Sequence, residues 1–282
     1  MPSPAEKAEA FRALHHGTRP LVLPNAWDVP SARVFENAGF PAVATSSAGL
    51  MVSRGYPDGE RMPKRELVGA VARIASTVGI PLSADIVAGY GRGPRAVAAT
   101  VKLIVEAGAV GVNLEDFDPV RDRLFPVGAQ SRKIQAVRAM GQQLGVPLVI
   151  NARTDALWKG EGSPERLLRE TIRRCIAYRD AGADCVYPMR LTDADSIGSV
   201  VQAVQCPVNV MVRKGLPPLS ELERLGVKRV SFGPGASYAT MGLLQRISRE
   251  VLTDGSFQSL LEGAIGFDEL NQLAVPRTPP VS

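Results

Sequence analysis

The chain has 282 residues, of which 45% are hydrophobic, enough to bury a substantial core and to exclude a disordered protein. Its formal net charge is +5, but the basic residues form no block, so the charge favours a solvated surface over a nucleic-acid interface. This length exceeds that of a typical small domain and suits one large α/β barrel.

Short apolar runs bounded by turn residues predict eight strands, in chain order at residues 21–25, 42–47, 81–86, 110–115, 147–153, 185–189, 207–212 and 229–233. Amphipathic patterns before, between and after them predict helices at residues 4–15, 30–37, 64–77, 94–107, 131–143, 163–181, 193–204, 219–225 and 237–252. Most of these strands are too apolar to expose one face to water, which is typical of parallel strands covered by helices.

One junction recurs four times along the chain, as NAGFPAV at 37–43, EAGAVGV at 106–112, DAGADCV at 180–186 and RLGVKRV at 224–230. Each copy ends a helix, places glycine just after it and begins a short strand. Repetition of this junction indicates stacked βαβ units. With eight strands, we predict an α/β fold of the (β/α)8 TIM-barrel type with an extra N-terminal helix and a C-terminal helical extension. A doubly wound Rossmann sheet is the alternative.

We expect residues 1–282 to form a single barrel domain, with residues 253–282 as a C-terminal helix and tail. The stretch at 275–282 is rich in proline, which favours a loose or docked tail.

Polar residues gather where the predicted strands end, and in a barrel the loops that follow the strands converge on one face. These strand-end residues, together with one aspartate in the loop after the second strand, are Asn25, Thr45, Ser46, Ser47, Asp58, Asp85, Glu115, Asp116, Asn151, Arg153, Asp155 and Asn209.

Three carboxylates of this set, Asp58, Asp85 and Glu115, would repel one another unless a cation compensates them. Oxygen ligands without histidine or cysteine favour Mg²⁺, with Mn²⁺ as the alternative. Arg153 offers a planar fork for a substrate carboxylate or phosphoryl group. The competing interpretation is structural: the acids form ion pairs with arginines at the barrel rim, and Arg153 forms a salt bridge with Asp155 or Glu115.

Further candidates for substrate binding are Ser46, Ser47, the amide groups around Ala48, and Asn209. The serines and amides would form an anion-binding nest, or the serines would simply cap the following turn. The segment GPGAS at 233–237 follows the eighth strand, where barrels commonly bind phosphate, so a phosphorylated substrate stays open.

The sequence lacks the residues that two classes of catalysis need, a histidine for nucleophilic catalysis and a strand lysine for Schiff-base chemistry. The two histidines, His15 and His16, fall on the first helix, where we expect the solvent face, so no Ser-His-Asp or Cys-His arrangement is expected. No lysine lies in a predicted strand, which argues against Schiff-base chemistry.

The three cysteines are odd in number and show no CxxC spacing, which argues against a zinc site or a disulfide framework. With no secretory signal and no apolar span, we expect a cytoplasmic protein that binds neither membrane nor nucleic acid.

Several segments together resemble the isocitrate lyase/phosphoenolpyruvate mutase superfamily, over nearly the whole chain to residue 252. They are PNAWDVPSAR at 24–33, TSS at 45–47, GYPD at 55–58, ADIVAGYG at 84–91, NLED at 113–116 and INARTD at 150–155. The resemblance implies Mg²⁺ at Asp85, with Asp58 and Glu115 acting through bridging waters. It implies a substrate carboxylate or phosphonate held by serines 46 and 47 and by Arg153. It also implies a homo-oligomer, a dimer of dimers in which the last helix is exchanged between subunits.

Two departures from this superfamily concern chemistry. A second acid usually follows the metal-binding aspartate by two residues, and here that position is Val87. The loop after the fourth strand usually carries Lys-x-Cys-Gly-His in the classical lyases, and here residues 117–130 read FDPVRDRLFPVGAQ, without cysteine, histidine or lysine.

The chain is therefore expected to be a Mg²⁺-dependent lyase for a small 2-oxo- or 2-hydroxy-carboxylate, cleaving a C–C bond or decarboxylating through an enolate. Without the loop cysteine, a reaction that needs little proton delivery is favoured. One alternative is P–C chemistry, as a phosphonomutase or phosphonopyruvate hydrolase, in which Asp58 orients the attacking group. Another is a family member that binds a metabolite without catalysis.

Overall fold

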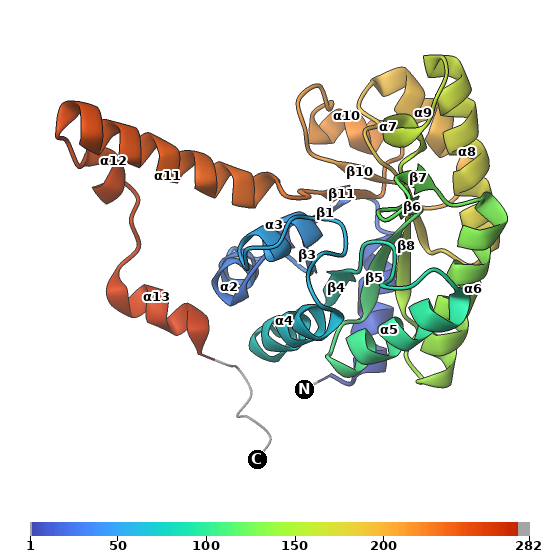
Figure 1. Ribbon diagram of the computed structural model, residues 1–282, viewed down its shortest axis with the longest axis horizontal. Helices are drawn as coiled ribbons and strands as arrows, with labels where there is room; N and C mark the ends of the chain where they lie inside the picture. The colour runs from blue at the N-terminus through green and yellow to red at the C-terminus, as the bar shows by residue number, and fades with distance from the viewer. Residues whose placement is uncertain (1, 276–282) are drawn as a thin grey trace.

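The structure is a computed structural model that describes residues 2–275 (Figure 1). Its strands are β1 (Leu21–Leu23), β2 (Asn25–Ala26), β3 (Val43–Thr45), β4 (Leu82–Asp85), β5 (Gly111–Glu115), β6 (Phe117–Asp118), β7 (Arg123–Leu124), β8 (Val149–Thr154), β9 (Cys185–Pro188), β10 (Asn209–Met211) and β11 (Arg229–Ser231).

The helices before β8 are α1 (Pro4–Leu14), α2 (Val29–Asn37), α3 (Ser47–Val52), α4 (Lys64–Thr77), α5 (Pro94–Glu106) and α6 (Val127–Gln143). Those after it are α7 (Ala156–Lys159), α8 (Pro164–Asp180), α9 (Ala194–Val204), α10 (Leu219–Arg224), α11 (Gly235–Asp254), α12 (Gln258–Leu261) and α13 (Phe267–Ala274).

The parallel strands close into a ring. One ladder runs β2-β3-β4-β5-β8-β9 and a second runs β1-β11-β10. A parallel bridge between Val186 and Val208 joins β9 to β10, and β1 continues into β2 through Pro24, so the two ladders meet at both ends. The expected eight-stranded barrel with helices outside is therefore confirmed, and the Rossmann alternative is wrong.

The first predicted strand divides in two, with β1 paired to β11 and β2 paired to β3. Pro24 separates them, and proline has no N–H to donate to a ladder. Its carbonyl instead accepts from Ala44 N at 2.9 Å, so the chain changes partner at this residue.

The recurring glycine junction forms as predicted. The four glycines, Gly39, Gly108, Gly182 and Gly226, have φ of 93°, 99°, 103° and 84°. This left-handed region is costly for a residue with a Cβ, so glycine lets each helix stop and turn into the next strand.

Helix α1 closes the N-terminal end of the barrel. Phe11 is fully buried beneath the start of β5, where a Cβ on Gly111 would lie 2.7 Å from Phe11 Cε1. Arg12 Nη2 donates to Pro147 O at 3.0 Å, just before β8. The open end of the barrel is therefore the C-terminal end of its strands.

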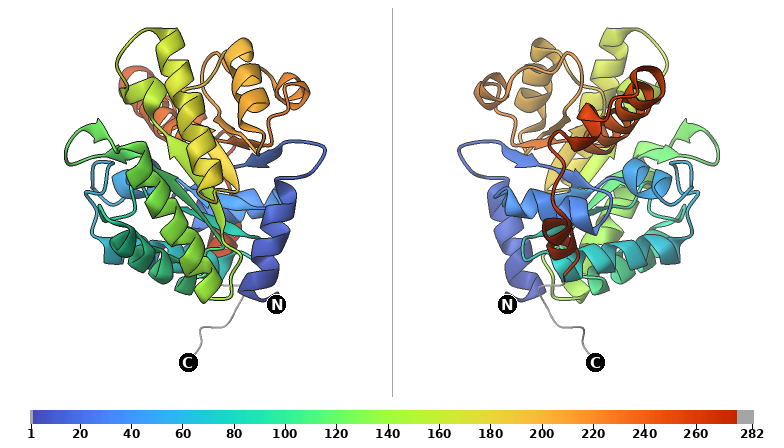
Figure 2. Two further views of the ribbon diagram at one scale, coloured as in Figure 1. Left: turned by 90° about the vertical axis from the view of Figure 1, so that its right-hand side faces the viewer. Right: turned by 90° about the vertical axis from the view of Figure 1, so that its left-hand side faces the viewer.

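The C-terminal extension leaves the barrel. Helix α11 projects from it as a long arm, and α13 returns to pack on α2 (Figures 1 and 2). Within α11, all of whose residues the structure describes, only Ser237 is buried. The predicted tail at 275–282 lies, beyond Val275, outside the described residues.

No described helix combines the length and apolar composition that crossing a bilayer requires.

Candidate active site

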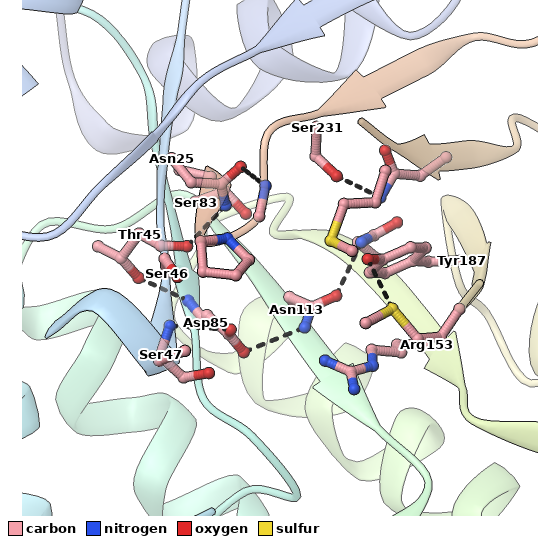
Figure 3. Close-up of a pocket in the computed structure, with 18 of the residues that line it drawn as sticks. Asn25, Thr45, Ser46, Ser47, Ser83, Asp85, Asn113, Arg153, Tyr187 and Ser231 are labelled. Atoms are coloured by element: carbon pink, nitrogen blue, oxygen red, sulfur yellow. Dashed lines mark hydrogen bonds between the residues drawn. The ribbon is translucent and has the colours of Figure 1, made fainter. Parts of the chain in front are cut away.

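A small cavity of about 140 Å³ opens at the C-terminal ends of the strands (Figure 3). Its size suits a substrate of only a few atoms, because pockets for drug-sized ligands start near 300 Å³. The lining residues are mostly polar: Asn25, Ala44, Thr45, Ser46, Ser47, Ala48, Asp58, Ser83, Asp85, Asn113, Asn151, Arg153, Trp158, Tyr187, Met189, Asn209, Met211, Arg229, Ser231, Gly233, Pro234 and Tyr238.

Asp85, the last residue of β4, is held from both sides. Its Oδ2 accepts from Ser47 N at 3.1 Å, and its Oδ1 accepts from Asn113 Nδ2 at 3.1 Å and from Val87 N at 3.2 Å. Asn113 is itself fixed, because its Oδ1 accepts from Asn151 Nδ2 at 2.8 Å. These hydrogen bonds fix the direction of the Asp85 carboxylate, which lines the cavity.

Val87 sits at φ 52°, in the left-handed region, where a β-branched residue is strained. This backbone conformation lets Val87 contact both acids of the site. Val87 N donates to Asp85 Oδ1, and Val87 O accepts from Glu115 N at 2.9 Å. The Val87 side chain is 2% exposed and packs in the core. The superfamily acid missing at this position is thus replaced by an apolar contact.

Arg153, on β8, forms ion pairs with two carboxylates. Its Nε and Nη2 donate to Asp155 Oδ1 and Oδ2 at 2.6 and 2.9 Å, and its Nη1 lies 2.9 Å from Glu115 Oε2. The structural salt bridges expected as the competing interpretation are therefore present. A guanidinium has five N–H donors, and these contacts use three. Two donors stay available to an anion in the cavity, so the two interpretations are compatible.

The charges around the cavity favour a cation. Burial raises the pKa of Glu115 well above its usual range, opposed by Arg153. Desolvation, and then the charge on Asp85, raises the pKa of Asp58 at the cavity mouth. The four carboxyl groups of Asp58, Asp85, Glu115 and Asp155 thus outnumber the two guanidinium groups at the cavity, those of Arg153 and Arg229, an imbalance that a divalent ion would correct.

The donor set fits Mg²⁺ better than zinc. Within residues 2–275, no three Asp, Glu, His or Cys side chains are arranged to ligate one ion directly. Mg²⁺ keeps several waters and takes one or two protein carboxylates, so Asp85 as direct ligand and Asp58 through water agree with its chemistry. Glu115 does not line the cavity and faces Arg153 instead.

The remaining predicted substrate-binding residues lie at the cavity as follows. Ser46 Oγ accepts from Gly49 N at 3.3 Å and caps α3, which is the capping alternative. Ser47, Ala48 and Asn209 line the cavity, and Asn209 Nδ2 donates to Ser231 Oγ at 3.1 Å.

The barrel's usual phosphate position differs from expectation. Gly233 N donates to Asn25 Oδ1 at 2.8 Å, so this amide is already occupied. Its φ is 55°, and a Cβ there would lie 2.2 Å from Met211 Sδ. The segment therefore offers less to a phosphate than its sequence suggests.

One expectation about the histidines is wrong. His16 is exposed, but His15 is 1% exposed, because α1 turns this side chain into the closed end of the barrel. His15 Nδ1 lies 2.9 Å from Phe11 O, and burial lowers its pKa to about 3. It lies far from the strand ends that carry the acids, so the exclusion of histidine catalysis is unaffected.

The loop after the fourth barrel strand also differs. Residues 117–130 form a short hairpin of β6 and β7 and then the first turn of α6, which begins four residues before the predicted position 131. Gln130 Nε2 donates to Glu115 O at 3.1 Å and ties this segment to the site.

Several cavity residues were missed in the sequence, among them Trp158, Tyr187, Met189 and Arg229. Met189 ends the predicted strand at 185–189 and Tyr187 lies two residues before it, on the same face, so the strand-end rule could have found both. Trp158 lies in the short helix α7, and its ring is 4.6 Å from the guanidinium carbon of Arg190. Arg229 is the first residue of the predicted strand at 229–233, and a charged residue at the start of a barrel strand was the available signal.

The phosphoenolpyruvate phosphomutase family model matches residues 11–252. The chain belongs to this family. The expected isocitrate lyase/phosphoenolpyruvate mutase superfamily is thereby confirmed, as is a lyase-type enzyme at the level of the family.

Individual relatives span the superfamily's chemistries. The chain is 38% identical to a candidate lyase/mutase from Burkholderia cenocepacia J2315, with 95% of each chain covered and a TM-score of 0.87. It is 28% identical over 271 residues to 2-methylisocitrate lyase of Halalkalibacterium halodurans, covering 92% of this chain and 87% of that one. It is 27% identical to phosphonopyruvate hydrolase, solved in complex with oxalate and Mg²⁺, with 95% and 94% covered and a TM-score of 0.82.

Proposed function

We propose that the protein is a Mg²⁺-dependent lyase that acts on a small 2-oxo- or 2-hydroxy-carboxylate and breaks a C–C bond, by cleavage or decarboxylation. The observation that carries this proposal is the pairing, in one cavity of about 140 Å³, of the directed carboxylate of Asp85 with the two unused donors of Arg153. Mn²⁺ is the alternative ion.

Different residues at the cavity would bind the ion and the substrate. Asp85 would hold the ion, with Asp58 and Glu115 outside it, and Arg153 would take the substrate carboxylate in its fork. Ser46, on the short turn into α3, would border the same carboxylate together with Ser47, Ala48 and, across the barrel, Asn209. Glu115 and Asp155 fix the guanidinium, so little freedom is lost when the substrate binds.

Charge stabilisation would drive the chemistry. When bound, Mg²⁺ acts as a Lewis acid on the 2-oxo or 2-hydroxy oxygen of the substrate. Arg153 stabilises the negative charge that develops as the bond beyond the α-carbon breaks. Asp58 would transfer a proton at the mouth of the cavity, because its raised pKa brings it closer to neutral pH.

P–C bond chemistry is the second candidate function. The matching family model is that of a phosphomutase, and a phosphonopyruvate hydrolase is among the relatives. Asp58 lies at the cavity mouth, where it would orient an attacking group.

We also propose that the arm formed by α11 to α13 packs on a second copy of the chain. The arm carries large apolar side chains that are exposed, namely Tyr238, Met241, Leu244, Leu252, Phe257, Leu261 and Phe267. A surface of this kind marks an interface. A dimer of dimers is the assembly we expect.

Product analysis tests the function. The purified protein with Mg²⁺ is incubated separately with oxaloacetate, 2-methylisocitrate and phosphonopyruvate, and products are followed by NMR. Pyruvate or another C–C cleavage product, lost when EDTA is added, supports the lyase. Phosphate release from phosphonopyruvate alone supports the second candidate. No turnover of any of the three, together with metabolite binding, contradicts both and favours a non-catalytic binding protein.

A further inference from the structure

Arg229, the first residue of β11, is an ionised side chain inside the barrel. It is 2% exposed and lines the cavity. Its Nε and Nη1 are buried and have no hydrogen-bond partner among the described residues, and no ion pair within residues 2–275 includes it. Guanidinium groups are rarely buried without a carboxylate, because transfer from water is unfavourable.

The position of Arg229 is the deep end of the cavity. Ser231 lies two residues further along β11 on the same face, so Arg229 is roughly 6.6 Å closer to the closed end of the barrel. Below it is His15, whose pKa the charge of Arg229 helps to lower. Asp85 is the one carboxylate among the groups that act on the pKa of Arg229, and its oxygens are already engaged by Ser47, Asn113 and Val87.

The two arginines that line the cavity differ in their carboxylate partners. Arg153 holds two carboxylates, whereas Arg229 holds none. Tyr187 also lines the cavity, and both guanidinium charges act on the pKa of its phenol. Two uncharged residues that line the same cavity do not compensate Arg229, because the Oδ1 atoms of Asn151 and Asn209 are buried and also have no hydrogen-bond partner among the described residues. A structural role would have left these donors and acceptors paired.

We propose that Arg229 is a specificity-determining residue that binds a second anionic group of the substrate, such as the distal carboxylate of a dicarboxylate. This rests on the proposed function: the 2-oxo-acid end lies between Asp85 and Arg153, and the other end of the molecule points down the barrel to Arg229. The unpaired donors of the guanidinium then gain the carboxylate that the protein does not supply. A substrate without a second anion leaves Arg229 unpaired, so it binds more weakly.

Calorimetric titration in the presence of Mg²⁺ tests this with probes that differ at one end. Oxalate and pyruvate lack the distal carboxylate, and 3,3-difluorooxaloacetate carries it and resists cleavage. The wild-type protein should bind difluorooxaloacetate more tightly than pyruvate. Arg229→Met should weaken difluorooxaloacetate binding by about 10- to 100-fold, the worth of a hydrogen bond to a charged group, and oxalate binding by less than about 3-fold.

Controls separate this role from a structural one. Arg95→Met removes an exposed arginine on α5 and should leave both affinities unchanged. The melting temperature of ligand-free Arg229→Met should stay the same or rise, because an unpaired buried charge is removed. Arg229→Lys, which keeps the charge, should retain part of the discrimination and serves if the Met variant does not fold.

Equal losses for oxalate and difluorooxaloacetate, or a wild-type protein that does not prefer the dicarboxylate, would overturn the role of Arg229. Failure of the wild-type protein to bind oxalate with Mg²⁺ would instead contradict the proposed function.

Discussion

Histidine 15 makes the stability of the fold depend on pH in a way that the structure quantifies. The side chain is 1% exposed, with its ring edge-on to Phe11 at 4.9 Å between centroids. Its Nδ1 lies 2.9 Å from Phe11 O, and its Nε2 has no partner among the described residues. Burial first, and then the charge of Arg229, lowers the pKa of His15 to about 3. The folded protein therefore keeps this imidazole neutral.

The sign and size of the effect follow from linkage. In the unfolded chain the pKa of a histidine is about 6.5. Below that pH the unfolded state therefore binds a proton at His15, whereas the folded state does not. The stability associated with neutral His15 is present above pH 6.5 and is lost as the pH falls. Between about pH 7.5 and pH 5 the loss is about 2 kcal/mol, which corresponds to roughly 4 to 8 °C in melting temperature.

His15→Gln removes the titrating group and keeps a side chain that can hydrogen-bond. Urea unfolding at several pH values should show that the wild type loses about 2 kcal/mol more than this variant between pH 7.5 and pH 5. His16→Gln, at the exposed neighbour, is the matched control and should follow the wild type. Parallel curves for wild type and His15→Gln would refute the reasoning, because they would mean that His15 is protonated in the folded state.

Three further predictions concern the core, the metal and the assembly. Arg174 Nη1 lies 2.9 Å from the buried carboxylate of Asp116, so Arg174→Met leaves that carboxylate without its cation. This variant should lose about 3–5 kcal/mol of unfolding free energy, measured by urea unfolding. A loss below about 1 kcal/mol contradicts the prediction. Val87→Asp places an acid beside Asp85 at a φ that aspartate tolerates, so calorimetry should show tighter Mg²⁺ binding, and weaker binding would argue against an ion at Asp85. Leu244→Arg, on the exposed arm, should reduce the sedimentation coefficient to that of a smaller species, and an unchanged coefficient contradicts exchange of the arm.

The barrel was predictable because its signals are local. Each glycine that ends a helix needs a positive φ, and each apolar strand must be covered on both faces, so the order of elements follows from neighbouring residues. The acids at strand ends were predictable for the same reason: the topology alone brings Asp85 and Arg153 to one face.

Other features depend on contacts between distant segments, which a single sequence does not display. Whether His15 faces water or the core depends on how α1 meets β5, roughly one hundred residues away. The state of Arg229 depends on the absence of a carboxylate across the barrel interior, and the split of the first strand depends on which ladders Pro24 separates.

The central claim is that Asp85 binds Mg²⁺ and that the ion and the cavity together bind a small carboxylate. Calorimetric titration of oxalate, with and without Mg²⁺, tests it in the wild type, in Asp85→Asn and in Asp254→Asn, an exposed control. We expect oxalate to bind the wild type and the control only with Mg²⁺, and affinity to fall by at least about 100-fold in Asp85→Asn. Oxalate binding of equal strength without Mg²⁺, or in Asp85→Asn, would contradict the account.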